Sequence, residues 1–330
     1  MSSARGDSRE SAPAKVVYSE FPGGSWQSRV VRRLVRYTLK PLLWLWAKSS
    51  ELPWPYRAAD HFGRFLWSPR GLERQWITLA NCRGELVEPA EPRGDRVVLY
   101  FHGGAFYVGG RWLHRQLVGR YAKALSAPVL SVDYRMLPRH SIADAIDDCL
   151  AAYRYLLALG VPPERIAFMG DSAGGYLTFA TALTARDEGL PLPGALTTMS
   201  PLTGWDTTRM TSALTAATCD VFPVAAVPIF TRNAQRANGT HPLLSPVDSD
   251  LTGLPPTLIQ STSTEMTFPD AELLATRLAE HGVPCEFQVW LQQVHVFQAA
   301  ALIVPESRLA IAEMVSFIDR TLPSAPNATT

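Results

Sequence analysis

The chain has 330 residues, of which 47% are hydrophobic and 18% are charged, and its formal net charge is +1. This is the composition of an ordinary globular protein, and the near-neutral charge argues against a nucleic-acid partner. No apolar run is long enough to span a bilayer, and no segment has the layout of a signal peptide. We therefore expect a cytoplasmic protein with one large α/β domain or two smaller ones.

The cysteines are far apart in the sequence and form no C-x-x-C pair, which argues against a metal site or a redox motif. We expect free and mostly buried thiols in a reducing compartment. The four positions are Cys82, Cys149, Cys219 and Cys285. No other pattern in the chain indicates a metal or a cofactor, so we expect neither.

The two ends of the chain are polar and rich in small residues. This composition predicts disorder over residues 1–16 and a loose tail over residues 323–330.

Residues 28–48, SRVVRRLVRYTLKPLLWLWAK, predict an amphipathic helix that Pro41 should kink or end. Basic side chains share one face of it: Arg29, Arg32, Arg33, Arg36 and Lys40. Apolar side chains share the opposite face: Val31, Leu34, Val35 and Leu42. The apolar face predicts packing against the rest of the protein. Contact between the basic face and an anionic membrane surface is the alternative.

From residue 75 onward, strand patterns alternate with helix patterns. The segments QWITLA and GELVEP flank NCRG and predict a hairpin. Apolar strands are predicted at 96–104, 127–135, 165–170, 194–203, 255–263 and 285–290. Helices are predicted at 141–159, 176–185, 270–282 and 306–322. The alternation predicts a mainly parallel central sheet with helices on both faces, and such sheets bind ligands at the carboxyl ends of their strands.

Ser172 lies in the stretch MGDSAGGYL, between a predicted strand and a predicted helix. The small residues around it are typical of a tight turn. They are also typical of the nucleophile elbow, G-x-S-x-G, in which a strained turn lifts the serine Oγ clear of the sheet. The remaining catalytic groups decide between these two interpretations.

A serine nucleophile needs a histidine base, and the base needs an acid to orient it. In proteins with a nucleophile elbow, the catalytic histidine follows a late strand of the chain. His295 follows the predicted strand CEFQVW and fits this position. Glu265 is the first carboxylate after the predicted strand PTLIQSTS, and Asp270 comes five residues later. We favour Glu265 because it is nearer the strand end, and Asp270 stays the alternative acid.

Acyl transfer also needs N–H donors for the oxyanion of the tetrahedral intermediate. Gly103 and Gly104 directly follow a predicted strand in FHGGAF, and Ala173 follows the serine. We expect the N–H groups of these three residues to form the oxyanion hole.

These motifs together resemble the hormone-sensitive-lipase-like branch of the α/β hydrolases, the bacterial family IV carboxylesterases. The resemblance is carried by YFHGGAF, VDYR, GDSAGGYL, SPVDSDLTGLPPTLIQ, AELLATRLAEHGV and VWLQQVHVFQ. It implies the α/β-hydrolase fold, a Ser172–Glu265–His295 triad, and ester hydrolysis without a cofactor. In this sequence Ala105 stands where the family has the third glycine of the oxyanion loop.

The resemblance also implies a helical cap over the active site. We expect the cap to comprise residues 17–70 and an insertion at 205–240. The hydrolase core would then comprise residues 71–204 and 241–322.

The aromatic residues of the expected cap favour an apolar acyl pocket and therefore short- to medium-chain carboxylic esters. Lactones or acetyl esters would use the same catalytic groups. A non-catalytic ligand-binding protein on this scaffold is a further alternative, although such a protein would be expected to lose Ser172 or His295. The sequence leaves open whether the protein forms a homodimer.

Overall fold

The structure is a computed structural model that describes residues 15–322. The sequence predicts disorder at both ends of the chain. Residues 1–14 and 323–330, to which most of this prediction applies, lie outside the described residues. The expectation for residues 1–16 is wrong at its last position, because Val16 already begins a strand. Within the described part of the chain, no helix is long and apolar enough to cross a membrane.

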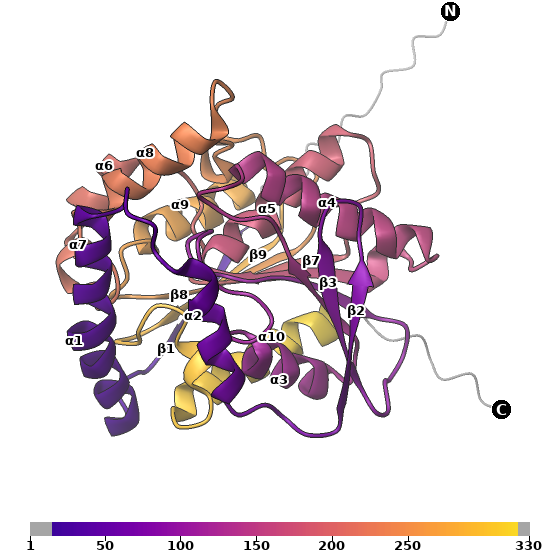
Figure 1. Cartoon of the computed structure of the whole chain (residues 1–330). Helices are drawn as coiled ribbons and strands as arrows, with labels where there is room; N and C mark the ends of the chain where they lie inside the picture. The colour runs from indigo at the N-terminus through magenta and orange to yellow at the C-terminus, as the bar shows by residue number, and fades with distance from the viewer. Residues whose placement is uncertain (1–14, 323–330) are drawn as a thin grey trace, which may run out of the picture.

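One nine-stranded sheet organises the described residues, in the order β1-β9-β8-β7-β6-β4-β5-β3-β2 (Figure 1). All neighbouring strands are parallel except at the β2–β3 and β3–β5 pairs, which are antiparallel. The β2–β3 pair is the hairpin that the sequence predicts. The strands are β1 (Val16–Phe21), β2 (Leu72–Thr78), β3 (Arg83–Pro89), β4 (Val97–Phe101), β5 (Val129–Asp133), β6 (Ile166–Asp171), β7 (Ala195–Met199), β8 (Thr257–Thr262) and β9 (Cys285–Trp290).

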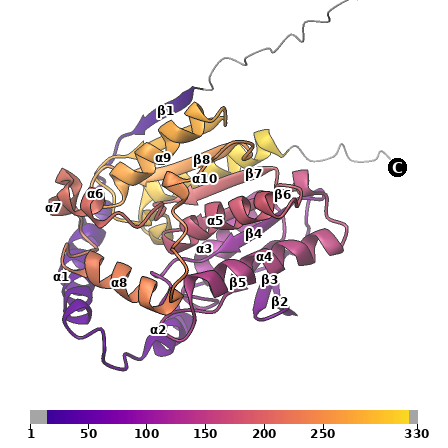
Figure 2. The same cartoon turned by 90° about the horizontal axis from the view of Figure 1, so that it is seen from above.

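Helices cover both faces of the sheet, as Figures 1 and 2 show. On one face, α4 (Ile142–Ala158), α5 (Ala173–Asp187) and α9 (Phe268–Glu280) share a hydrophobic core with the sheet. On the other face, α3 (Arg115–Leu125) and α10 (Pro305–Thr321) form a second core. All residues of β6, β7 and β8 are buried, which explains why apolar and small residues predominate in these strands. The α/β fold class predicted from the sequence is confirmed.

Strand β1 is a feature that the sequence does not predict. Residues 16–21, assigned from the sequence partly to the disordered end and partly to the cap, pair in parallel with β9 at the edge of the core sheet. The ring of Phe21 stacks on that of Trp290 at a centroid distance of 4.1 Å. The first strand along the chain therefore belongs to the sheet and not to the covering helices.

Two separate segments form the helices above the carboxyl ends of the central strands (Figure 2). The first contains α1 (Trp26–Lys48) and α2 (Tyr56–Phe62), and the second contains α6 (Thr207–Ser212), α7 (Leu214–Thr218) and α8 (Ala226–Asn238). Helices α1 and α8 pack against each other. We describe both segments together as the cap, and its division from the core remains a proposal.

Helix α1 differs from its sequence prediction in two ways. It continues through Pro41 instead of ending there. The predicted apolar face is also only partly the packed face, because Leu34 and Leu42 are 60% and 49% exposed. Val31 and Val35 do pack against the core.

The packed side of α1 includes three of the basic residues. Arg32 and Arg36 donate to the carboxylate of Asp220, at 2.6 and 3.2 Å, and Lys40 donates to the backbone oxygen of Cys219 at 2.6 Å. Asp220 is buried and needs a cationic partner, so it turns part of the basic face inward. Three of the five cations considered for membrane contact therefore bind polar groups of the second cap segment.

The four cysteines are free thiols, three of them buried and Cys82 partly buried. Burial is the main cause that raises the pKa of Cys82 and that of Cys285 to about 12, so neither is a reactive thiolate at neutral pH.

Candidate active site

Ser172 occupies the junction between β6 and α5, in the strained backbone conformation φ 53°, ψ −114°. A Cβ on Gly170 would collide with the carbonyl oxygen of Gly174, and a Cβ on Gly174 would collide with that of Phe101. The glycines are therefore required because strand, turn and helix approach each other at backbone contact distance. The backbone N–H of Ser172 donates to Met199 O at 2.9 Å, which fixes the turn against β7. The sequence predicts this elbow from the small residues around the serine.

His295 lies in the loop after β9, with its ring between Ser172 and Glu265. Its Nε2 is 2.9 Å from Ser172 Oγ, and its Nδ1 is 2.6 Å from Glu265 Oε2. The next residue, Val296, has a positive φ of 54°, and its N–H donates to Ser200 Oγ at 3.1 Å. This anchored turn holds the imidazole in place although it lies in a loop. The three residues that the sequence proposes as a triad are thus brought together.

Glu265 is almost completely buried at the end of β8. Its Oε1 accepts hydrogen bonds from Ser261 Oγ at 2.5 Å and from the N–H of Thr262 at 3.0 Å. Its Oε2 faces His295 Nδ1. These donors supply the hydrogen bonds that a buried carboxylate needs, and they also fix its orientation toward the histidine.

Asp270, the alternative acid, is not in contact with His295. It lies in the first turn of α9 and accepts a hydrogen bond from Arg209 Nε at 2.6 Å. Burial raises the pKa of Asp270, and the hydrogen bond and charge of Arg209 only partly oppose this. Asp270 therefore joins α9 to the cap helix α6, which carries Arg209.

The loop after β4 presents the oxyanion-hole candidates with one change from the prediction. The N–H of Gly103 donates to Asp171 Oδ1 at 3.0 Å, so it is not available to a substrate. Gly104 and Ala105 line the same cavity as Ser172 and Ala173. Gly104 has a φ of 113°, and a Cβ there would collide with the backbone of Val108. The prediction of Gly103 as a donor is wrong because a buried carboxylate already takes its N–H.

Asp171, the residue before the serine, is a site residue that the sequence analysis missed. Besides Gly103, its carboxylate accepts a hydrogen bond from the Tyr100 hydroxyl at 2.6 Å and lies 3.4 Å from His114 Nε2. Burial alone would raise the pKa of Asp171, but its polar neighbours, first His114 through its charge and hydrogen bond and then the Tyr100 hydroxyl, together outweigh burial and lower the pKa. The signal was an acidic residue in an otherwise small and apolar turn, where a carboxylate needs donors.

His102 and His114 lie behind the same loop, with ring centroids 5.2 Å apart. Burial is the main cause that lowers the pKa of His102 to about 4. Burial also acts to lower the pKa of His114, but the charge and hydrogen bond of Asp171, together with the charge of Asp60 and a backbone hydrogen bond to Gly110, outweigh burial and raise the pKa. Only His114 is therefore suited to carry a positive charge next to Asp171.

A cavity of about 300 Å³ opens above Ser172 and His295, with mostly apolar walls. The first cap segment contributes Leu39, Leu43, Trp46 and Tyr56 to the walls, and the second contributes Met210, Val221, Phe222, Ala226, Val227 and Phe230. The Phe222 ring stands edge-on to the His295 imidazole at 5.0 Å. Both cap segments therefore wall the space in which a substrate would meet the serine.

Fold and site together define an α/β hydrolase, and residues 98–299 match the model of a family with the alpha/beta hydrolase fold. The chain is 37% identical over 323 residues to the carboxylesterase/phospholipase LipF of Mycobacterium tuberculosis, covering 94% of this chain and 85% of that protein. It is 36% identical over 268 residues to an acetyl-hydrolase of Streptomyces hygroscopicus, covering 79% of this chain and 86% of that protein.

Among solved structures, the chain is similar to an esterase from the bacterial hormone-sensitive lipase family, with a TM-score of 0.79 and 30% identity. That comparison covers 91% of this chain and 99% of the other. The chain belongs to this family, the hormone-sensitive-lipase-like carboxylesterases of bacteria, and is a carboxylic ester hydrolase.

Proposed function

We propose that the protein hydrolyses short- to medium-chain carboxylic esters through an acyl-enzyme formed on Ser172. The observation that carries this proposal is the chain of contacts from Ser172 through His295 to Glu265 at the floor of an apolar cavity. A hydroxyl, an imidazole and a buried carboxylate in this order are the groups that an acyl transfer needs.

In the proposed mechanism, His295 Nε2 takes the proton of Ser172 Oγ as the oxygen attacks the ester carbonyl. Glu265 holds the Nδ1–H of the imidazole and stabilises the positive charge that develops on the ring. His295 then gives the proton to the leaving alcohol. In the second half of the cycle it activates a water molecule that releases the carboxylic acid.

The oxyanion is held, in this proposal, by the N–H groups of Gly104, Ala105 and Ala173. Ala105 takes the place first assigned to Gly103, because it lines the cavity next to Gly104 and its own backbone has a positive φ of 53°. Removing one oxyanion donor typically costs about 3 kcal/mol of transition-state stabilisation.

The size of the cavity supports a preference for short acyl groups. A volume of about 300 Å³ with aromatic walls suits a small apolar group. The similarity to an acetyl-hydrolase is consistent with the short end of this range. Lactones remain the alternative substrate class, because the same catalytic groups would open a cyclic ester.

The test is the substitution Ser172→Ala, assayed with p-nitrophenyl esters of increasing acyl length. We expect the variant to lose turnover while keeping its far-ultraviolet circular dichroism. We expect the wild type to hydrolyse esters with acyl groups from acetyl up to hexanoyl faster than esters with longer acyl chains. Ser316→Ala, which changes an exposed serine on α10, is the matched control. Near wild-type turnover in folded Ser172→Ala protein would refute the assignment of the nucleophile.

A further inference from the structure

A groove on the side of the sheet covered by α3 and α10 gathers four cationic side chains. It has a volume of about 640 Å³. Its lining includes Arg70 from the segment before β2, Arg120 and Lys123 from α3, and Arg308 from α10. No acidic residue contributes to the lining. The whole chain has a net charge of only +1, so this concentration of positive charge is local.

These four cations have no carboxylate partner among residues 15–322, whereas several other arginines of the described chain do. Arg135, for example, pairs with both Asp144 and Asp148. Arg308 instead donates to the backbone oxygen of Ala301 at 3.1 Å. Like charges held together without counter-charge oppose folding, which favours an anionic ligand that compensates for them.

Two of the four cations, Arg120 and Arg308, make contacts that hold them in position at the groove. The guanidinium of Arg120 lies over the ring of Trp67, 5.3 Å from its centroid. Burial and, to a smaller extent, the charge of Arg308 lower the pKa of Arg120. Pro69 and Ile311 supply apolar parts of the wall. Guanidinium groups in such a pocket match the oxygens of a phosphate group.

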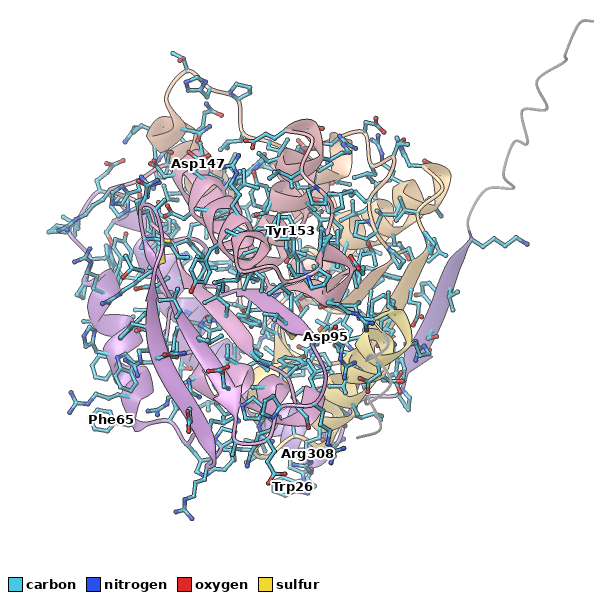
Figure 3. All side chains as sticks on the ribbon, turned by 90° about the vertical axis from the view of Figure 1, so that its right-hand side faces the viewer. Trp26, Phe65, Asp95, Asp147, Tyr153 and Arg308 are labelled. Atoms are coloured by element: carbon cyan, nitrogen blue, oxygen red, sulfur yellow. The ribbon has the colours of Figure 1, made fainter. Side chains whose placement is uncertain are left out.

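Exposed apolar side chains lie next in sequence to residues that line the groove, in two separate segments. On one side, Phe65 is 78% exposed and Trp67 is 47% exposed, just before Arg70. On the other side, the exposed residues are Leu302, Ile303 and Leu309, which lie next to Ala301 and Arg308 in sequence. Figure 3 shows Phe65, Arg308 and Trp26 along the same lower edge of the molecule. Large exposed apolar groups around a cationic site are typical of surfaces that contact membranes.

We propose that this groove binds the phosphate groups of anionic phospholipids and seats the enzyme on a lipid surface through the apolar side chains around it. The site is distinct from the cavity above Ser172 and does not depend on the catalytic assignment. A second copy of the chain is a poorer occupant, because a two-fold contact would bring two cationic grooves together without counter-charge.

The test is co-sedimentation with vesicles of phosphatidylcholine alone or mixed with phosphatidylglycerol. We expect binding only to the mixed vesicles, and weaker binding at high salt. The triple variant R70Q/K123Q/R308Q should lose more than about tenfold in affinity, since each cation near an anionic surface contributes favourably. The control K15Q/R139Q/R232Q removes the same charges from other exposed positions and should bind like the wild type.

One further comparison, between vesicles and soluble pyrophosphate, separates the lipid from a soluble source of phosphate. Phe65→Ser should weaken vesicle binding without changing the affinity for pyrophosphate. All variants should keep wild-type turnover of p-nitrophenyl butyrate and wild-type circular dichroism, because none of these residues lines the catalytic cavity. Equal binding to both vesicle types, an equal loss in the control, or binding of pyrophosphate without binding of vesicles would each overturn the proposal.

Discussion

At the scale of single residues, the site depends on buried polar groups that are fixed by more than one partner. Glu265 has three donors around its two oxygens, and Asp171 has the Tyr100 hydroxyl and the Gly103 N–H as well as His114. A buried carboxylate without such donors would be strongly destabilising. The same hydrogen bonds that make these charges tolerable therefore also set the positions of His295 and the oxyanion loop.

The two candidate acids give a direct comparison. Glu265→Gln should lower kcat by about three to four orders of magnitude, because the amide no longer stabilises the imidazolium and favours the wrong tautomer. Asp270→Asn should lower stability through its contact with Arg209 and leave kcat within a few-fold of wild type. Steady-state kinetics and urea unfolding of both variants separate the two effects. A larger fall in kcat for Asp270→Asn would show that the acid has been misassigned.

The Asp171–His114 pair predicts a pH-dependent contribution to stability. The folded pKa of His114 is raised above its ordinary value of about 6.5. The stabilisation is therefore full below about pH 6.5 and is lost as the pH rises through the raised folded pKa. His114→Gln should thus cost about 1–3 kcal/mol of unfolding free energy near pH 6 and less near pH 9.

Urea unfolding of wild type and His114→Gln at both pH values measures this difference. His61→Gln, which changes an exposed histidine on α2, is the control and should show no such trend. A cost that is equal at the two pH values would mean that His114 acts through packing alone.

At the scale of elements, charge pairing and apolar burial together determine how α1 lies on the protein. One edge of its packed side is lined by Arg32, Arg36 and Lys40, which reach Asp220 and the carbonyl oxygen of Cys219. The middle of that side carries Val31 and Val35, and farther along Leu39, Leu43 and Trp46 reach the substrate cavity. Helix α1 thus connects the two cap segments and forms part of the cavity wall at the same time.

This arrangement predicts that Asp220 is a key residue of the cap. Asp220→Asn keeps the shape of the side chain but leaves two arginines without their counter-charge, which should cost about 1–3 kcal/mol. It should also raise KM, since α1 lines the cavity. Glu51→Gln, which breaks an exposed pair with Arg236, is the control and should change little. Thermal unfolding and KM for p-nitrophenyl butyrate measure both effects, and an unchanged KM would argue against the coupling.

At the scale of the whole molecule, the sequence was most informative where local backbone geometry and chemistry coincide. The elbow at Ser172, the strand that precedes His295 and the carboxylate at the end of β8 each follow from a local pattern. Strand β1 could not be predicted, because it is short and its pairing with β9 is a contact between distant parts of the chain. Gly103 is not available as an oxyanion donor because its N–H already donates to Asp171 Oδ1, and no local sequence pattern specifies this contact either.

The N-terminal part of the chain has two roles that successive deletions should separate. Deletion of residues 1–24 removes β1 and leaves the edge of β9 and Trp290 uncovered, so it should lower the unfolding temperature while KM stays near wild type. Deletion of residues 1–48 also removes α1 and with it Leu39, Leu43 and Trp46 from the cavity wall. Exposing that apolar surface costs roughly 25 cal/mol per Å², so the longer deletion should raise KM or abolish turnover and promote aggregation. Kinetics and size-exclusion chromatography of both variants test this, and a monomeric, fully active protein lacking residues 1–48 would contradict a role of α1 in closing the site.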